Sequence, residues 1–449
     1  MSFRIDKQTI SDIDLFSQNE KTPSLFGYYN RTVTIGGQEK LYRIFRTPIS
    51  DIEYLDNRKK EIEYFINLKD NLKLNKRQLD YVEYYLKNRR NPLKNNLIDA
   101  ARDSIAYKLK TNHDYYTIRE GIINLSRILA DLRRFLLKLQ NTNIPETLSN
   151  KFKLAFDFVD SDFITGFIQN SPRDSNKIKP KLINKLDDLF RSKQVHELRE
   201  VLDAIYEIDV LQSLSELVKS QGFSLPEYVK NEHPIFETED CFHPLIKEPQ
   251  SNSFKFNNDH SLCFITGPNM SGKSTFLKSV AILVYFSHIG LPVPAKKLSI
   301  SVFQGLFTTI NLSDSLSQGF SHFYAEVNRV REMTLSLQEN NNLVVILDEL
   351  FRGTNVKDAF DGTLMVIKAL SRIKGAFFFI SSHILEVAEH LYSSKKIDFK
   401  CFESVLKKDI PVYDYILKEG ISTERVGLQI IKNENIEKVL IDIINKQGE

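Results

Sequence analysis

Residues 267–275 read Gly-Pro-Asn-Met-Ser-Gly-Lys-Ser-Thr, and this spacing of Gly, Lys and Ser is the Walker A pattern of a phosphate-binding loop. The glycines allow a concave backbone whose N–H groups face phosphate oxygens, and a following helix adds its positive end. We expect Lys273 to reach the β- and γ-phosphates of ATP, and the Ser274 hydroxyl to bind Mg²⁺. A glycine-rich turn with an incidental lysine is the alternative. The candidate nucleotide contacts are Gly267, Pro268, Asn269, Met270, Ser271, Gly272, Lys273, Ser274 and Thr275.

The segments on either side of this loop favour the functional interpretation. Residues 261–266 form a short apolar run, which is typical of a buried strand that delivers the loop. Residues 275–289 form a longer apolar stretch without Gly or Pro, which is typical of a helix. A strand, a loop and a helix in this order are the context that the motif requires. The sequence therefore predicts a nucleotide-binding site.

Two carboxylates follow a second apolar run. Residues 343–347 are all apolar, and Asp348 and Glu349 come directly after them. We expect Asp348 to hold Mg²⁺ through a water, and Glu349 to orient or deprotonate the water that attacks the γ-phosphate. A strand that ends in two solvated acids is the alternative, and the Walker A loop upstream makes it the weaker one.

Two further polar segments could complete the site. The apolar run 376–380 ends in Ser-Ser-His383, and a histidine at such a strand end can sense the γ-phosphate and place the water. Leu-Ser-Gln-Gly at 316–319 resembles the signature loop of ABC-type ATPases, which contacts the nucleotide bound by the other subunit. A polar turn before any helix would look the same. If the segment acts as a signature loop, the active form is a homodimer.

The chain changes character near residue 225. Between residues 50 and 220 apolar side chains recur at helical spacing, as in Ile122, Leu125, Leu129, Leu132 and Leu136. After Pro226, short apolar runs alternate with helical patterns, which predicts an α/β fold. We therefore expect an all-α domain over 1–228 and an α/β domain over 229–449. The further expected strands are 306–311, 343–347 and 376–381, followed by a hairpin of residues 399–406 and 412–417 that turns at 408–409.

Composition sets looser limits. The 449 residues are 42% hydrophobic and 27% charged, which is ordinary for a globular protein, and the net charge of +3 neither demands nor excludes a polyanionic partner. The three cysteines are far apart and fit a reducing compartment better than a disulfide framework. No apolar run is long enough to cross a bilayer. We expect a cytoplasmic protein without a membrane partner.

Basic residues gather at two places in the helical part. One group surrounds the break near Pro92, and the other follows Pro172. Such groups could bind phosphates of a nucleic acid, although groups this small are commonly a solvated face. The residues are Lys87, Arg89, Arg90 and Lys94 in the first group, and Arg173, Lys177, Lys179, Lys181 and Lys185 in the second.

Taken together, these motifs resemble the MutS family of DNA mismatch-repair ATPases. The loop 267–275 differs from the usual family loop in having Ser271 where Gly is commoner. Residues 348–354 resemble the Walker B region of the family, with Phe351 where Gly is usual. Gly-Phe-Ser-His-Phe at 319–323 resembles its Gly-X-Ser-Thr-Phe element, and Ser-His383 resembles its Thr-His element. The resemblance implies that Asn269 contacts the nucleotide and that Ser321 contacts the nucleotide of a partner subunit.

The resemblance also implies an overall organisation. We expect an ABC-type P-loop ATPase domain with a C-terminal helical dimerisation segment, preceded by an all-α core and lever domain. Hydrolysis of ATP with Mg²⁺ would use Lys273, Glu349 and His383. The homodimer would move helical levers on DNA and act with a downstream repair protein in repair or recombination.

Some expected features of the family are missing from the sequence. No Phe-X-Glu motif, which the family uses as its mismatch wedge, occurs in the chain, and the helical core begins almost at Met1. We therefore expect a form without the mismatch-binding and connector domains, in which residues 141–195 could contain a small DNA clamp. A nucleotide-switched regulator of a non-DNA partner, such as a ribosome or a nuclease, is the alternative. A chromosome-condensing or transporter ATPase ranks last, since long heptad arms or a membrane partner would be needed.

Overall fold

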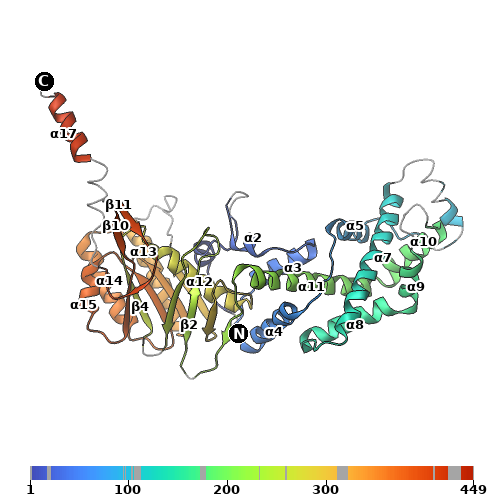
Figure 1. Cartoon of the computed structure of the whole chain (residues 1–449), viewed down its shortest axis with the longest axis horizontal. Helices are drawn as coiled ribbons and strands as arrows, with labels where there is room; N and C mark the ends of the chain where they lie inside the picture. Colours follow the sequence, from blue (N-terminus) through green and yellow to red (C-terminus); the bar gives the residue numbers. More distant parts are fainter. Residues whose placement is uncertain are drawn as a thin grey trace. The chain divides into compact units, whose positions relative to one another are not determined.

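The computed structural model divides the chain into two compact units (Figure 1). The α/β unit comprises Met1–Tyr28, Thr47–Asp56 and Ser220–Glu449, and the helical unit comprises Tyr29–Arg46 and Asn57–Lys219. The sequence predicted one boundary near residue 228, whereas the structure assigns two N-terminal segments to the α/β unit. The described residues are 3–17, 22–94, 96, 98–102, 105, 113–171, 178–231, 233–257, 260–310, 322–407, 410–422 and 436–447.

A six-stranded sheet forms the centre of the α/β unit, with strand order β12-β9-β4-β8-β7-β6. The five strands from β9 to β6 are parallel, and β12 runs antiparallel to β9. Every residue of β4, β6, β7 and β8 is buried, as expected for a parallel sheet that helices cover on both faces. The strands are β4 (Leu262–Thr266), β6 (Gly305–Thr309), β7 (Leu343–Asp348), β8 (Phe377–Ser381), β9 (Ile397–Cys401) and β12 (Lys418–Glu419).

Helices pack on this sheet according to the alternation of its side chains. On one face, α13 (His322–Glu339), α14 (Val356–Leu370) and α15 (Leu385–Leu391) share a hydrophobic cluster with alternate residues of β7 and β8. The helix α12 (Lys273–His288) contacts β6, β7 and β8 but lies outside that cluster. Since successive residues of a strand point to opposite faces, α12 covers the other face.

The expected elements around the phosphate-binding loop are confirmed. The predicted strands correspond to β4, β6, β7 and β8, and the predicted helix corresponds to α12. The two predicted arms pair antiparallel as β10 (Ser404–Lys407) and β11 (Ile410–Tyr413), while the predicted turn at 408–409 lies outside the described residues. Residues 399–401, which the sequence assigned to that hairpin, belong instead to β9 of the central sheet, because β9 pairs with β4.

A second, four-stranded sheet was not predicted. Its strand order is β1-β5-β2-β3, with antiparallel β2–β5 and β2–β3 pairs. The pairing joins residues far apart in the chain, as in Phe236 with Ile300, so local sequence patterns gave little sign of it. Its strands are β1 (Glu227–Tyr228), β2 (Phe236–Cys241), β3 (Asn252–Phe256) and β5 (Lys297–Ile300).

The N-terminal segment belongs to the α/β unit because it binds the outer edge of the central sheet. Arg4 forms a parallel bridge with Gly305 of β6, and α1 (Lys7–Asp12) contacts the same strand. Asp12 is buried and accepts hydrogen bonds from the Thr308 hydroxyl at 2.6 Å and from the Ile310 N–H at 3.0 Å. These contacts cover the free edge of β6.

The helical unit confirms the predicted helices. Within the described part of residues 141–195 the regular structure is helical and no strand is present, so the small strand-rich clamp that the sequence left open is not found there. A short π-helical segment, Leu189–Lys193, precedes the last helix. The helices that lie wholly or mostly in this unit are α3 (Ile35–Phe45), α4 (Ile52–Asn67), α5 (Lys76–Leu86), α7 (His113–Leu139), α8 (Glu146–Asp160), α9 (Asp162–Asn170), α10 (Pro180–Asp188) and α11 (Val195–Gln221).

Buried charges hold these helices together. Glu207 of α11 is paired with Lys40 of α3 at 2.7 Å, Lys151 of α8 at 3.1 Å and Arg58 of α4 at 3.6 Å. Burial by itself would raise the pKa of Glu207, but Arg58, Lys40 and Lys151 outweigh burial and lower it. Four helices therefore meet at one ionised carboxylate.

Two further observations concern surfaces. Within the described ranges, none of the helices is both long and apolar enough to cross a bilayer. The last described helix, α17 (Ile436–Gln447), carries exposed apolar side chains along its length. They are Ile436, Val439, Leu440, Ile441, Ile443 and Ile444.

Candidate nucleotide site

The loop between β4 and α12 lies at the carboxyl edge of the parallel sheet, as the sequence predicted. Its backbone is left-handed at Gly267 (φ 147°), Met270 (φ 68°) and Gly272 (φ 102°). A Cβ atom at residue 267 would lie 2.7 Å from the carbonyl oxygen of Phe402, so this position requires glycine. The loop therefore wraps closely around the start of α12.

Lys273, the first residue of α12, is folded back over the loop. Its side chain is only 5% exposed, and Nζ donates to the carbonyl oxygens of Gly267 at 2.8 Å and Pro268 at 3.0 Å. The Glu349 carboxylate lies 3.9 Å away. Burial lowers the pKa of Lys273, and the nearby carboxylates of Glu349 and Asp348 partly offset that effect. The ammonium group is thus held by weak acceptors beside an opposite charge.

A hydroxyl and a carboxylate meet next to this lysine. Ser274 Oγ donates to Asp348 Oδ2 at 2.5 Å, and the Ser381 hydroxyl donates to Asp348 Oδ1. Asp348 ends β7 and Ser381 ends β8, so the adjacent parallel strands bring the two groups to the same edge. Oxygen ligands of this kind are those that Mg²⁺ prefers. The donor set fits the predicted metal ion.

Glu349 is surrounded by cationic or donor groups. Its Oε2 atom lies 2.9 Å from Nε of Arg352 and 3.4 Å from Nδ1 of His383. The hydrogen bond with His383 lowers the pKa of Glu349; burial opposes this, and Arg352 and Lys273 lower it further. The carboxylate is therefore ionised near neutral pH. The backbone N–H of Glu349 donates to the Ser381 carbonyl at 3.2 Å.

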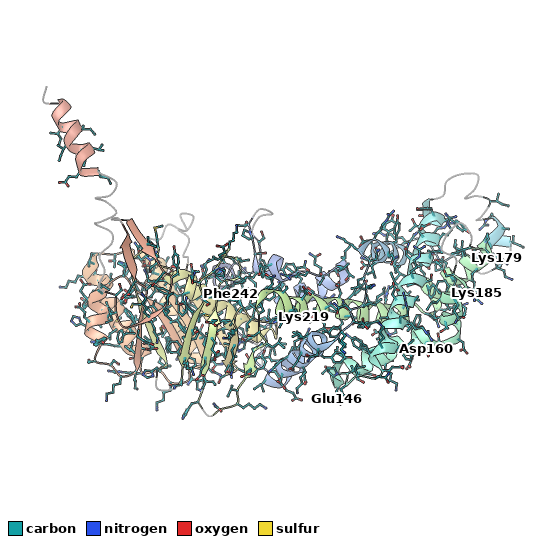
Figure 2. All side chains as sticks on the ribbon, in the orientation of Figure 1. Glu146, Asp160, Lys179, Lys185, Lys219 and Phe242 are labelled. Atoms are coloured by element: carbon teal, nitrogen blue, oxygen red, sulfur yellow. The ribbon has the colours of Figure 1, made fainter. Side chains whose placement is uncertain are left out.

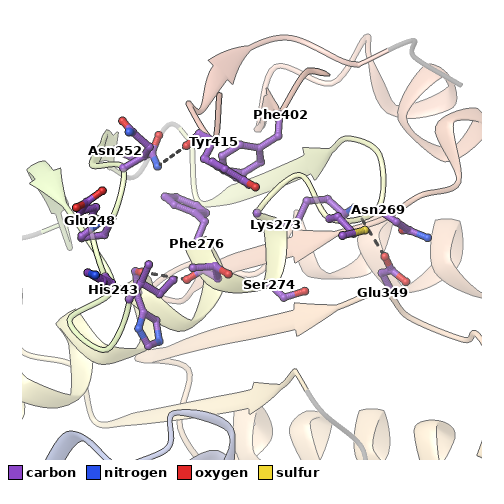
Figure 3. Close-up of a pocket in the computed structure, with 18 of the residues that line it drawn as sticks. His243, Glu248, Asn252, Asn269, Lys273, Ser274, Phe276, Glu349, Phe402 and Tyr415 are labelled. Atoms are coloured by element: carbon purple, nitrogen blue, oxygen red, sulfur yellow. Dashed lines mark hydrogen bonds and ion pairs between the residues drawn. The ribbon is translucent and has the colours of Figure 1, made fainter. Parts of the chain in front are cut away.

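Lys273, Ser274 and Glu349 border a cavity of about 720 Å³ (Figure 3), which is within the range of small-ligand sites. The phosphate-binding loop and Glu349 form one side of the cavity, and Phe276, Phe402 and Tyr415 contribute aromatic rings. Asn252 holds the segment that carries Tyr415. Its Nδ2 atom donates to the Tyr415 carbonyl at 3.1 Å, and its Oδ1 atom accepts from the Leu417 N–H at 2.7 Å.

The structure brings most of the predicted site residues together. The cavity is lined by Asn269, Met270, Gly272, Lys273, Ser274, Thr275 and Glu349, and Asp348 is hydrogen-bonded to Ser274. His383 contacts Glu349 but does not line the cavity. Ser271 is buried, and its hydroxyl has no hydrogen-bond partner within the described structure. Ser321 lies outside the described residues.

Sequence reasoning missed two groups at this site. Arg352 lines the cavity and contacts Glu349, and its position three residues after that carboxylate was the available signal. Tyr415 also lines the cavity, but it comes from the far end of the chain and nothing near it in the sequence marks it. Tyr415 comes close to the phosphate-binding loop because the chain returns to the central sheet at β12.

This arrangement is typical of nucleotide-binding α/β domains. In such domains a glycine loop with left-handed backbone joins a buried strand to a helix, beside a hydroxyl–carboxylate pair at the carboxyl edge of the sheet. Comparison with known proteins agrees. Residues 263–447 match the model of MutS domain V, and residues 8–215 match that of MutS domain III. The chain belongs to the MutS family.

Two curated relatives illustrate the likeness. The DNA mismatch repair protein MutS of Alkaliphilus metalliredigens is 29% identical over 283 residues, which are 58% of this chain and 31% of the relative. The DNA mismatch repair protein MutS of Petrotoga mobilis is 26% identical over 245 residues, which are 54% of this chain and 30% of the relative. The chain thus matches less than a third of the length of either relative.

Proposed function

We propose that this chain is a Mg²⁺-dependent ATPase of the ABC-type P-loop class that acts on DNA in repair or recombination. The observation that carries the proposal is the convergence of Lys273, the Ser274–Asp348 pair and Glu349 on one cavity. Each of these groups has the chemistry that ATP binding and hydrolysis need at that place. Family membership supports the same conclusion.

Lys273 would exchange its two carbonyl acceptors for phosphate oxygens. The ammonium is pre-placed within the loop and partly desolvated, so a charged phosphate is a stronger acceptor than Gly267 O or Pro268 O. Ser274 and Asp348 would hold Mg²⁺, which when bound neutralises charge on the phosphates. The aromatic end of the cavity, with Phe276 and Tyr415, would take the base.

Glu349 would place the attacking water. Its carboxylate is ionised and fixed on one side by Arg352 and His383, so Oε1 can accept a hydrogen bond from water and then its proton. His383 would keep Glu349 oriented, and the half-exposed imidazole would respond to the γ-phosphate. Hydrolysis would then proceed without a covalent intermediate on the chain.

A homodimer is proposed for the active form. Ser321 would contact the nucleotide bound by the partner subunit, so that two ATP molecules lie between two copies of the α/β unit. The exposed apolar side chains of α17 support its assignment as a C-terminal dimerisation segment. ATP state would then move the helical unit, the proposed core and lever. In this scheme the helical unit, Tyr29–Arg46 and Asn57–Lys219, is the core and lever, and the α/β unit is the ATPase domain.

DNA is the proposed partner of the helical unit, and a downstream repair protein is a further one. The curated relatives are named as DNA mismatch repair proteins. Lys179 is the N-cap residue that precedes α10, and Lys185 lies in the last turn of that helix (Figure 2), where its Nζ atom is 5.1 Å from the Phe163 ring centre. Lysines beside an exposed aromatic ring can bind backbone phosphates and bases. Because the chain has no Phe-X-Glu motif, binding would not use the usual mismatch wedge.

The Glu349→Gln variant tests the enzymatic part. We expect it to bind ATP with wild-type affinity, to lose about 100-fold or more in kcat, and to accumulate as an ATP-bound dimer in sedimentation experiments. Glu386→Gln, an exposed acid on α15, is the matched control and should leave kcat unchanged. Hydrolysis by Glu349→Gln at the wild-type rate would show that the water-placing role is wrong.

A binding panel tests the partner. ATP-trapped Glu349→Gln would be presented with duplex, branched and mismatched DNA and with structured RNA at low salt. We expect affinity for at least one DNA structure, and a fall in affinity with rising salt concentration. No affinity for any DNA, with or without ATP, would contradict a DNA partner. It would favour a nucleotide-switched regulator of a ribosome or a nuclease, in line with the helical character of the described part of 141–195.

A further inference from the structure

A carboxylate from the helix α13 holds the loop that follows β7 in place. Glu326 of α13 is 6% exposed. Its Oε1 atom accepts from the backbone N–H of Arg352 at 3.2 Å, and its Oε2 atom accepts from the N–H of Gly353 at 3.3 Å. A single buried carboxylate therefore satisfies two successive backbone donors. Two hydrogen bonds from successive backbone N–H groups to one buried side chain restrain the local backbone.

This loop needs support from outside. Its backbone is left-handed at Glu349 (φ 52°) and at Phe351 (φ 61°). Residues with side chains adopt this region rarely, and the conformation persists only where the surroundings enforce it. Thr363 of α14 contributes a long hydrogen bond to the Leu350 carbonyl at 3.5 Å. The stronger restraints come from α13.

A second contact joins the same helix to the same loop. The ring of Phe351 meets that of Phe323, in the first turn of α13, with their centres 5.9 Å apart and an edge-on geometry. On its other side the Phe351 ring packs on Gly362, where an added Cβ would lie 3.1 Å from the ring. Phe351 is 6% exposed. The helix α13 thus holds the loop at two points, one polar and one aromatic.

The restraint on the loop backbone passes to Glu349 through one side chain. The guanidinium of Arg352 lies 2.9 Å from Glu349 Oε2 and 4.0 Å from Asp348 Oδ2. This side chain is 45% exposed and is held by these two carboxylates, so a displacement of the backbone at residue 352 would disturb the contact between Arg352 and Glu349. Glu326 fixes that backbone, and Arg352 in turn orients the Glu349 carboxylate.

We propose that Glu326 is a positioning residue for Glu349 and acts through Arg352. The inference rests on the proposed ATP hydrolysis and extends it to a residue of another helix.

The Glu326→Gln variant tests the positioning role in the full-length protein. The amide keeps the size of the side chain, but its NH₂ group cannot accept a hydrogen bond from a backbone N–H. We expect kcat for ATP to fall about ten-fold or more. The Kd of a non-hydrolysable ATP analogue and the thermal unfolding midpoint should stay close to wild type. A purely structural role would instead change Kd, the midpoint and kcat together.

A double-mutant cycle tests the path through Arg352. We expect Arg352→Ala to lower kcat about ten-fold, and Glu326→Gln to add less than two-fold in that background. Because the Arg352 side chain is half-exposed, Arg352→Ala keeps the path testable should Glu326→Gln lower the unfolding midpoint. Glu332→Gln, an acid on the exposed side of the same helix, is the control and should leave kcat unchanged.

The outcomes separate this inference from the proposed function. Wild-type kcat in either single variant, or effects that simply multiply in the double variant, would overturn the positioning role while the ATPase stands. A wild-type chain that binds ATP without turning it over would contradict the proposed function, and this inference with it.

Discussion

Buried charges occur in both units of the molecule, but they are arranged in opposite ways. In the helical unit, Glu207 is enclosed by three cations at 2.7–3.6 Å, which come from three different helices. In the α/β unit, Lys273 has, among the described residues, two backbone carbonyls at hydrogen-bond distance and a carboxylate at 3.9 Å, beside a cavity. The charges of the first, closed cluster are paired with one another and leave no space for a ligand between them. In the second, open cluster the charged Lys273 has neutral carbonyl groups as its hydrogen-bond partners, and the adjoining cavity has room for a ligand.

This difference teaches how to tell a site from a structural network. Residue type and burial are alike in the two clusters, so neither identifies function. The distinguishing features are the incomplete pairing of Lys273 and the origin of the groups at strand ends and in a loop, where side chains can converge on open space. The charges around Glu207 come from helices that pack together, and there they fix the packing.

The largest expected effect is on the closed cluster. Glu207→Ala should lower the free energy of unfolding by about 3 kcal/mol, because three half-buried cations lose their common buried partner, although Lys40 and Lys151 keep Asp203. Nucleotide affinity should not change. Since the folded-state pKa of Glu207 is lowered, this stabilisation is present above the unfolded-state pKa of about 4.5 and is lost as the pH falls below it. Urea denaturation at pH 7 and pH 3 measures both parts.

The control for this variant is Glu200→Ala, an exposed position on the same helix. It should change the free energy of unfolding by less than about 0.5 kcal/mol. If Glu207→Ala proved no more destabilising than Glu200→Ala, the cluster would not be a structural network and the contrast between the two units would fail.

The next effect concerns the open cluster. Lys273→Ala should weaken ATP binding about 100-fold or more, because a charge-assisted contact to the phosphates is lost. Its free energy of unfolding should change little, since the ammonium has only weak acceptors in the free protein. Isothermal titration calorimetry with Mg–ATP measures the affinity. Lys278→Ala on the same helix removes a lysine paired with Asp14 and should leave the affinity within two-fold.

The pH dependence of stability gives a third test. Burial lowers the pKa of His288 to about 4, so the folded protein keeps this imidazole neutral while the unfolded chain protonates it below about 6.5. The unfolded state then binds more protons, and the free energy of unfolding should fall by about 2 kcal/mol from this group between pH 7 and pH 5.

Replacing this histidine sharpens the same test. His288→Gln should reduce the acid slope of the unfolding free energy, whereas His196→Gln, at an exposed position, should not. The slope that remains is assigned to His243, whose pKa burial also lowers to about 4. An unchanged slope in His288→Gln would mean that the imidazole is protonated in the folded state.

The smallest effect is expected at the aromatic end of the cavity. Tyr415→Ala should weaken ATP about five- to ten-fold through loss of contact with the base, and should affect inorganic triphosphate hardly at all. Competition binding with the two ligands separates the contributions. Tyr392→Ala, another exposed tyrosine of this unit, serves as the control. Equal losses for ATP and triphosphate would show that Tyr415 does not face the base.

Much of the α/β unit could be predicted because its signals are local. A buried strand followed by Gly267, Gly272 and Lys273 defines its own geometry, and runs of apolar residues mark β7 and β8. The four-stranded sheet could not be found in this way, since Phe236 pairs with Ile300 across a long stretch of chain. Its short strands have no periodicity that would separate them from loops.

The same reasoning explains the gaps at the site. Asp348 and Glu349 were found because they directly follow a strand. Tyr415 was missed because its place depends on how β12 returns to the sheet, and Glu326 because its partners are backbone N–H groups of a distant loop. Contacts with backbone atoms leave no complementary side chain in the sequence to suggest them.

The N-terminal segment has a consequence for how this chain is made. Residue 4 bridges β6, and Asp12 binds the backbone of residue 310, so during synthesis this segment must wait for some three hundred more residues before its binding site exists. Where this segment is missing, β6 has no neighbour on its outer side, and an uncovered strand edge can pair with other chains. Expression yield should therefore suffer from amino-terminal deletions, while catalytic groups remain intact.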